Sequence, residues 1–207
     1  MGESATTARW TRIGLRLVVI TMAYNAIEAA VAIVAGIRAA SIALIGFGLD
    51  SVIELCAAAA LLWRLRLEAG GADHETVELG ERRVQRFVGV TFIALSLYVV
   101  VVAGWTLWAQ EPPRESPIGI GLAVASLILM PLIAWGKLRA ADRIGSAALR
   151  AEAKETLACS YLSFTLLLGL TVNVVAGWWW ADPLAALLMV PWLLKEGWEG
   201  IRGEECD

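Results

Sequence analysis

Ser41-Ile-Ala-Leu-Ile-Gly-Phe-Gly-Leu-Asp50-Ser-Val-Ile-Glu54 is the stretch around which the chain is organised. It lies in an apolar run from Ala39 to Trp63, which can cross a bilayer because a membrane helix needs about 20 residues. Asp50 falls near the middle of the run, and Glu54 follows one helical turn later, so a helix places both carboxyl groups on one face. Each acid costs about 2.5–3.5 kcal/mol at the centre of a bilayer. Two stacked acids therefore indicate half of a cation site.

The composition of the whole chain is that of a membrane protein. Apolar residues make up 58% of the 207 residues, and the mean hydropathy is +0.67, which is too apolar for an ordinary soluble domain. The net charge is −3 and there is no long basic tract, so no nucleic acid partner is expected. Cysteines 56, 159 and 206 show no paired spacing, which argues against a disulfide framework. The N-terminus shows no pattern of a removable signal peptide.

Hydropathy predicts an all-α integral membrane protein with six transmembrane helices, all in one domain that covers residues 1–207. The predicted spans are about 15–37, 40–63, 87–110, 117–136, 148–176 and 183–198. Only nine residues follow the sixth span, so no soluble C-terminal domain is expected. Fourteen of the 17 Lys and Arg residues fall in the N-terminal tail, the 64–86 and 137–150 loops and the C-terminal end. The positive-inside rule therefore predicts that both termini are cytoplasmic.

A second pair of candidate ligands occurs in the fifth span, where Glu155 and Cys159 repeat the four-residue spacing of Asp50 and Glu54. If the second and fifth helices lie side by side, three carboxyl groups and a thiol come together, and four such ligands suit a tetrahedral zinc ion. The alternative is structural. A membrane acid can be protonated and hydrogen-bonded, and a cysteine in an apolar run is more often a small buried hydrophobe. The cost of intramembrane acids favours a functional role for Asp50 and Glu54. For Cys159 the functional and the structural interpretations are equally supported.

These motifs resemble those of the cation diffusion facilitator family, and the resemblance runs through all six spans. The segments that carry it are Ser41-Ile-Ala-Leu through Asp50 and Glu54, Ala151-Glu-Ala-Lys-Glu155 with Cys159, and Ala181-Asp-Pro-Leu-Ala-Ala followed by Glu196-Gly-Trp-Glu. The resemblance implies a metal site with two ligands on the second helix and two on the fifth, which in this chain are Asp50, Glu54, Glu155 and Cys159. It also implies a homodimer that exchanges zinc, with cadmium, cobalt, iron or manganese as alternative substrates, for protons by alternating access.

Two departures from the family pattern accompany the resemblance. The family commonly has His and Asp on the fifth helix, where this chain has Glu155 and Cys159. Many members also carry a cytoplasmic metal-sensing domain after the sixth helix, so this chain looks like the tail-less branch. A dimer would then form through the membrane helices.

Proton coupling is expected because four deprotonated ligands would carry four negative charges against the two positive charges of the ion. The empty site should therefore hold protons that metal displaces.

The remaining polar residues of the spans admit two interpretations. Asn25 and Glu28 can add a polar contact behind the ligands, or they can form hydrogen bonds between helices. Glu152 shares a helix face with Glu155 and Cys159, and it can support the ligands from behind or belong to the cytoplasmic entry. Asp182, just before Pro183, is interpreted as the N-cap of the sixth helix. Asp73-His74 could hold an accessory ion, although a solvated loop is the better interpretation.

No nucleophile–base arrangement appears in the sequence, so no enzyme is expected. Two functions remain. One is a proton-coupled exporter of divalent metal. The other is a membrane scaffold or regulatory subunit that keeps the fold without transport.

Overall fold

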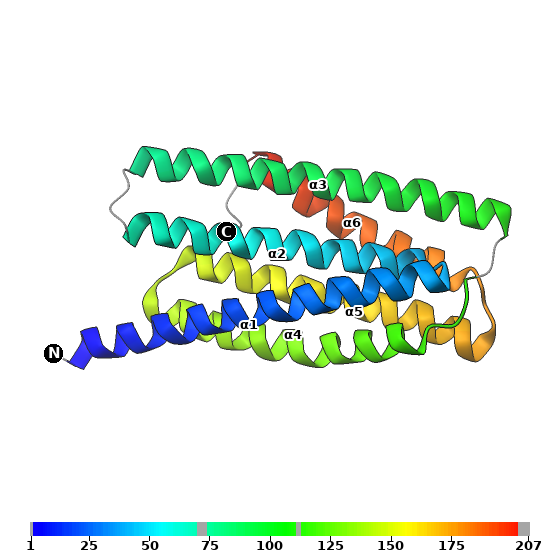
Figure 1. Ribbon diagram of the computed structural model, residues 1–207, viewed down its shortest axis with the longest axis horizontal. Coiled ribbons are helices and arrows are strands. Elements are labelled where there is room, and N and C mark those ends of the chain that lie inside the picture. Colours follow the sequence, from blue (N-terminus) through cyan, green and yellow to red (C-terminus); the bar gives the residue numbers. More distant parts are fainter. Residues whose placement is uncertain (1, 70–73, 111–112, 203–207) are drawn as a thin grey trace.

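The computed structural model describes residues 2–69, 74–110 and 113–202, and this part of the chain consists of six helices without any strand (Figure 1). Their bounds are α1 Gly2–Ala39, α2 Ile42–Ala69, α3 His74–Ala109, α4 Pro117–Ile144, α5 Ala147–Ala176 and α6 Ala181–Arg202. The prediction of an all-α fold with six helices is confirmed. The first five helices are long and apolar enough to cross a membrane.

α6 is the one described helix without a long stretch of low charge. Each stretch of 18 residues within it carries at least three charged residues. Two of its acids nevertheless lie against the rest of the protein: Asp182 is only 1% exposed, and Glu196 lines a pocket together with Asp50. Because an acid that faces the inside of a bundle avoids lipid, the polarity of α6 reflects its contacts within the protein.

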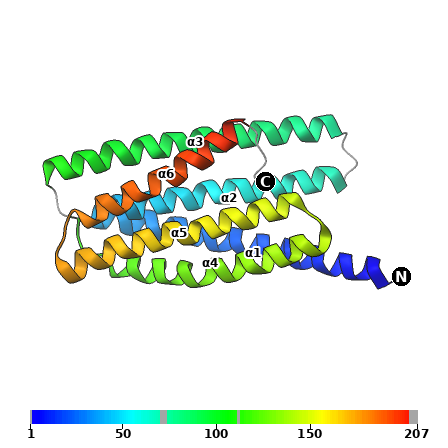
Figure 2. The same ribbon diagram turned by 180° about the vertical axis from the view of Figure 1, so that it is seen from behind.

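The helices pack in two groups, which Figures 1 and 2 show from opposite sides. In the first group α1 packs against α2 and α4, and α5 packs against α4 and α2. In the second group α3 and α6 pack against each other, and both of them contact α2. α2 and α5 therefore touch each other, as the predicted site requires, and both of them also contact α6.

α3 and α6 are in close contact at a pair of glycines. A Cβ atom added to Gly89 would lie 2.7 Å from the carbonyl oxygen of Gly197, and one added to Gly197 would lie 3.0 Å from the carbonyl oxygen of Gly89. Only residues without side chains permit this distance, which is typical of tightly packed membrane helices. Because Gly197 directly follows Glu196, this contact fixes the turn of α6 that carries a pocket-lining acid.

Asp182 caps α2 rather than its own helix. α6 already begins at Ala181, so the prediction that Asp182 is the N-cap of the sixth helix is wrong. Its carboxylate accepts hydrogen bonds from the hydroxyl of Ser41 and from the backbone N–H of Ile42, the latter at 2.9 Å. The N–H groups that begin a helix lack partners within the helix, and the helix dipole favours an anion there. Asp182 therefore anchors the start of the helix that carries Asp50.

The connection between α4 and α5 is shorter than the predicted 137–150 loop. α4 continues past Gly136 to Ile144, and α5 begins at Ala147, so most of the predicted loop is helical. Gly145 ends α4 in the left-handed conformation with φ +69°, and the Ser146 hydroxyl caps α5. The extra turns of α4 place Lys137, which the sequence assigns to a cytoplasmic loop, inside the bundle with 0% of its surface exposed.

Candidate metal centre

Three of the four predicted ligands meet at one point. Asp50 and Glu54 on α2 and Cys159 on α5 each bring one oxygen or sulfur atom to within 4.8 Å of the others. Asp50 is 3% exposed and Cys159 is fully buried. Oxygen and sulfur ligands lie about 2.0–2.3 Å from a bound zinc ion. Small side-chain rotations would therefore bring all three atoms onto one ion.

Glu155 lies next to this group without belonging to it. Its carboxylate is not among the atoms that lie within 4.8 Å of one another, and its side chain is only partly buried. It nevertheless lines the same pocket as Asp50 and Glu54. Direct ligation by Glu155 remains a prediction.

The pocket itself is acidic. Its lining comes from four helices and consists of Asp50, Ile53, Glu54, Ala57, Phe92, Glu155, Ala158, Trp192 and Glu196. Four of these nine residues are carboxylic acids and none is basic. Glu196 on α6 is the member that the sequence analysis does not identify as a site residue. It follows Lys195 at the end of an apolar segment, and such a charged pair is typical of a helix end at the membrane surface.

α1 adds two polar side chains that contact the ligands. Asn25 Nδ2 donates a 2.8 Å hydrogen bond to Glu54 Oε2. Glu28, which is 0% exposed, accepts hydrogen bonds from the hydroxyls of Ser51 and Ser126, and the Cys159 thiol lies 4.0 Å from its Oε2. Both residues therefore lie directly behind the ligands. A role of Asn25 and Glu28 in metal binding remains a prediction.

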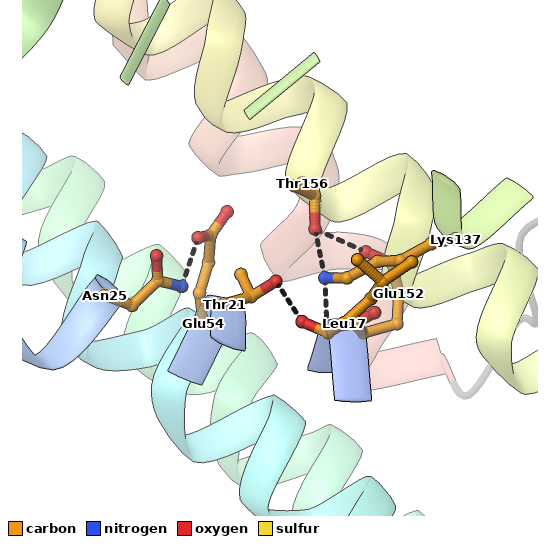
Figure 3. Close-up of polar contacts among 7 residues, drawn as sticks. All are labelled: Leu17, Thr21, Asn25, Glu54, Lys137, Glu152 and Thr156. Atoms are coloured by element: carbon orange, nitrogen blue, oxygen red, sulfur yellow. Dashed lines mark hydrogen bonds and ion pairs between the residues drawn. The ribbon is translucent and has the colours of Figure 1, made fainter. Parts of the chain in front are cut away.

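Lys137 forms a second buried polar cluster between α4 and α5 (Figure 3). Its Nζ atom lies 2.7 Å from Glu152 Oε1 and 2.9 Å from Thr156 Oγ1. Glu152, which the sequence groups with the ligands, is thus held by a lysine, and its Oε2 atom is buried without a hydrogen-bond partner in the described part of the chain. In the sequence, Lys137 resembles a residue of a cytoplasmic loop because Arg139 and Arg143 follow it.

Helical spacing is the signal that could have identified Lys137. The buried face of α4 includes Met130, Ala134, Lys137 and Ala141, so the lysine continues a stripe with steps of three and four residues. The candidate accessory site at Asp73-His74 is different: the position of Asp73 and the side chain of His74 lie outside the described residues.

Comparison with known proteins places the chain in a family. The cation efflux transmembrane domain matches residues 18–203. An uncharacterised transporter of Synechocystis sp. is 30% identical over 151 residues, which cover 71% of this chain and 48% of that protein. A cadmium, cobalt and zinc/H+–K+ antiporter of Bacillus subtilis is 24% identical over 111 residues, which cover 53% of this chain and 35% of the antiporter. The chain thus spans about half or less of the length of these relatives. It is a multi-pass integral membrane protein and belongs to the cation efflux family, also called the cation diffusion facilitator family.

Proposed function

We propose that the protein carries divalent metal cations across a membrane, with zinc as the preferred substrate and protons moving in the opposite direction. The family supports transport of divalent cations, and one relative is named for cadmium, cobalt and zinc. The observation that carries the proposal is the group formed by Asp50, Glu54 and Cys159, within membrane-spanning helices. Mixed oxygen and sulfur ligands favour zinc and cadmium over magnesium and calcium.

The acidic pocket suggests how the ion reaches this group. Glu54 and Ala57 follow Asp50 toward the end of α2, Glu155 precedes Cys159 toward the start of α5, and Glu196 lies near the end of α6. These helix ends lie toward the same end of the bundle as the N-terminus of α1 (Figure 1). The positive-inside rule predicts that this end faces the cytoplasm. We propose that the ion enters there, attracted by the carboxylates, and leaves when the opposite end opens.

Proton exchange is part of the proposal because the ligands bind metal in their deprotonated forms. Zinc uptake into proteoliposomes that contain a zinc-sensitive dye should therefore accelerate when the lumen is more acidic than the outside, since protons leave as zinc enters. Calorimetry in buffers of different ionisation enthalpy should show that zinc binding releases protons between pH 6 and 8.

The outcomes separate the parts of this proposal. Zinc uptake that does not respond to the pH gradient, together with a proton count of zero, would contradict antiport but not transport. Zinc uptake no faster than in protein-free liposomes would contradict transport itself and favour the scaffold or regulatory subunit. A homodimer formed through the membrane helices remains a prediction of the family resemblance.

A further inference from the structure

We propose that Asn25 belongs to the metal centre itself. Its amide nitrogen positions Glu54, and its carbonyl oxygen is a neutral ligand that α1 adds to an ion bound by α2 and α5. This inference rests on the proposed function, because it concerns the same site. It assigns to the site a helix that the motif on α2 and α5 does not include.

Asn25 contacts the ligand Glu54 directly. Asn25 Nδ2 donates to Glu54 Oε2 at 2.8 Å (Figure 3). When Glu54 is deprotonated, as metal binding requires, its oxygens only accept hydrogen bonds, so the nitrogen of the amide faces Glu54 and the carbonyl oxygen faces elsewhere. The bond occupies one oxygen of Glu54 and leaves the other available to an ion shared with Asp50 and Cys159.

The carbonyl oxygen of Asn25 is buried in the protein. Asn25 is 1% exposed, and its Oδ1 atom is buried without a hydrogen-bond partner among the described residues. Most buried polar atoms in proteins have a partner, and an atom without one lacks the compensation for its lost hydration. An amide carbonyl oxygen next to a carboxylate is also a ligand type that divalent cations accept. A bound ion would supply the missing partner.

The group of three ligands is one short of the number that a tetrahedral ion takes. Asp50, Glu54 and Cys159 provide three ligand atoms, whereas a tetrahedral ion takes four. Glu155, the predicted fourth ligand, lies outside this group. A fourth anionic ligand would leave two uncompensated negative charges around a divalent ion, while the amide of Asn25 leaves only one. In a site of low dielectric constant, the neutral ligand avoids the additional repulsion.

The test uses metal selectivity, which a purely structural role would not change. Asn25→Leu preserves the approximate volume and removes both the donor and the oxygen. Zinc binding should weaken by about 10- to 100-fold, the range expected when a group that orients a ligand is removed. Because the thiol of Cys159 remains and a hard oxygen is lost, manganese should lose more affinity than cadmium. The ratio of cadmium to manganese affinity, measured by calorimetry, should therefore rise.

Two further variants complete the experiment. Asn25→Asp keeps the oxygen and adds charge, so the cadmium to manganese ratio should fall, and this variant decides the matter if Asn25→Leu does not fold. Thr21→Val is the matched control, because Thr21 lies one turn earlier on α1, is 2% exposed, and donates to Leu17 of its own helix (Figure 3). It should leave the affinity ratio unchanged. If the wild-type protein binds and transports zinc while both Asn25 variants keep its affinity ratio, the inference is wrong although the proposed function stands.

Discussion

Asp50→Ala is expected to abolish metal flux and leave the protein folded. The Asp50 carboxylate is 3% exposed, accepts no hydrogen bond from the described residues and lies in the group of three ligand atoms. Its removal takes a ligand from the ion and also takes a costly acid out of the membrane. Zinc uptake into proteoliposomes should fall by more than about 100-fold, the upper end of what contacts behind a metal ligand contribute. The melting temperature in detergent should not decrease.

Asp142→Ala provides the matched control for this prediction. Asp142 is also an aspartate on a helix, but its side chain is 59% exposed and pairs with Arg150, whose side chain is 50% exposed. This variant should transport zinc at the wild-type rate. Transport by Asp50→Ala at that same rate would show that Asp50 is not a ligand and that the proposed site is wrong.

Lys137→Met should produce the largest loss of stability among single substitutions in the bundle. Lys137 is 0% exposed, and its partner Glu152 keeps only 9% of its side chain accessible. Removing one member of a buried ion pair leaves the other charge without compensation, which typically costs about 3–5 kcal/mol. The Glu152 Oε2 atom has no hydrogen-bond partner among the described residues, and in the variant the Oε1 atom would lose its lysine partner as well. Thermal unfolding in detergent measures the effect.

Two further variants distinguish the effect of breaking the buried ion pair from the effect of replacing any lysine by methionine. Lys195→Met makes the same substitution at a lysine whose side chain is 57% exposed and whose Nζ lies 3.6 Å from Glu199 Oε1, where the loss should be at most about 1 kcal/mol. Lys137→Met combined with Glu152→Leu removes both charges and should recover much of the lost stability. A Lys137→Met protein that unfolds at the wild-type temperature would contradict a structural role for the pair.

The parts of the site that the sequence predicts are those that depend on spacing along one helix. Asp50 and Glu54 lie four residues apart in an apolar run, and Glu155 and Cys159 repeat that spacing, so the relation within each pair follows from helical geometry alone. The packing of α2 against α5 confirms that the two helices are neighbours. The exact meeting of ligand atoms does not follow from spacing, which is why Glu155 lies outside the group of three.

The contacts that the sequence misses all join distant segments. Asp182 and Ser41 are 141 residues apart. A local sequence pattern cannot predict that an acid before a proline caps a different helix. Lys137 resembles a loop residue until α4 is known to continue to Ile144. Glu196 resembles a surface charge until α6 is placed against α2 and α5. In each case a charge near a predicted helix end is covered, fully for Asp182 and Lys137 and partly for Glu196, by a neighbour whose position only the fold determines.

X-ray absorption at the zinc edge of the purified, zinc-loaded protein tests the central claim most directly. We expect one sulfur ligand at about 2.3 Å and oxygen ligands at about 2.0–2.2 Å. The sulfur contribution should disappear in Cys159→Ser and persist in Cys56→Ser, since Cys56 is exposed and Cys159 is buried beside Asp50 and Glu54. A bound zinc ion without a sulfur ligand, or with one that survives Cys159→Ser, would contradict a metal centre formed between α2 and α5.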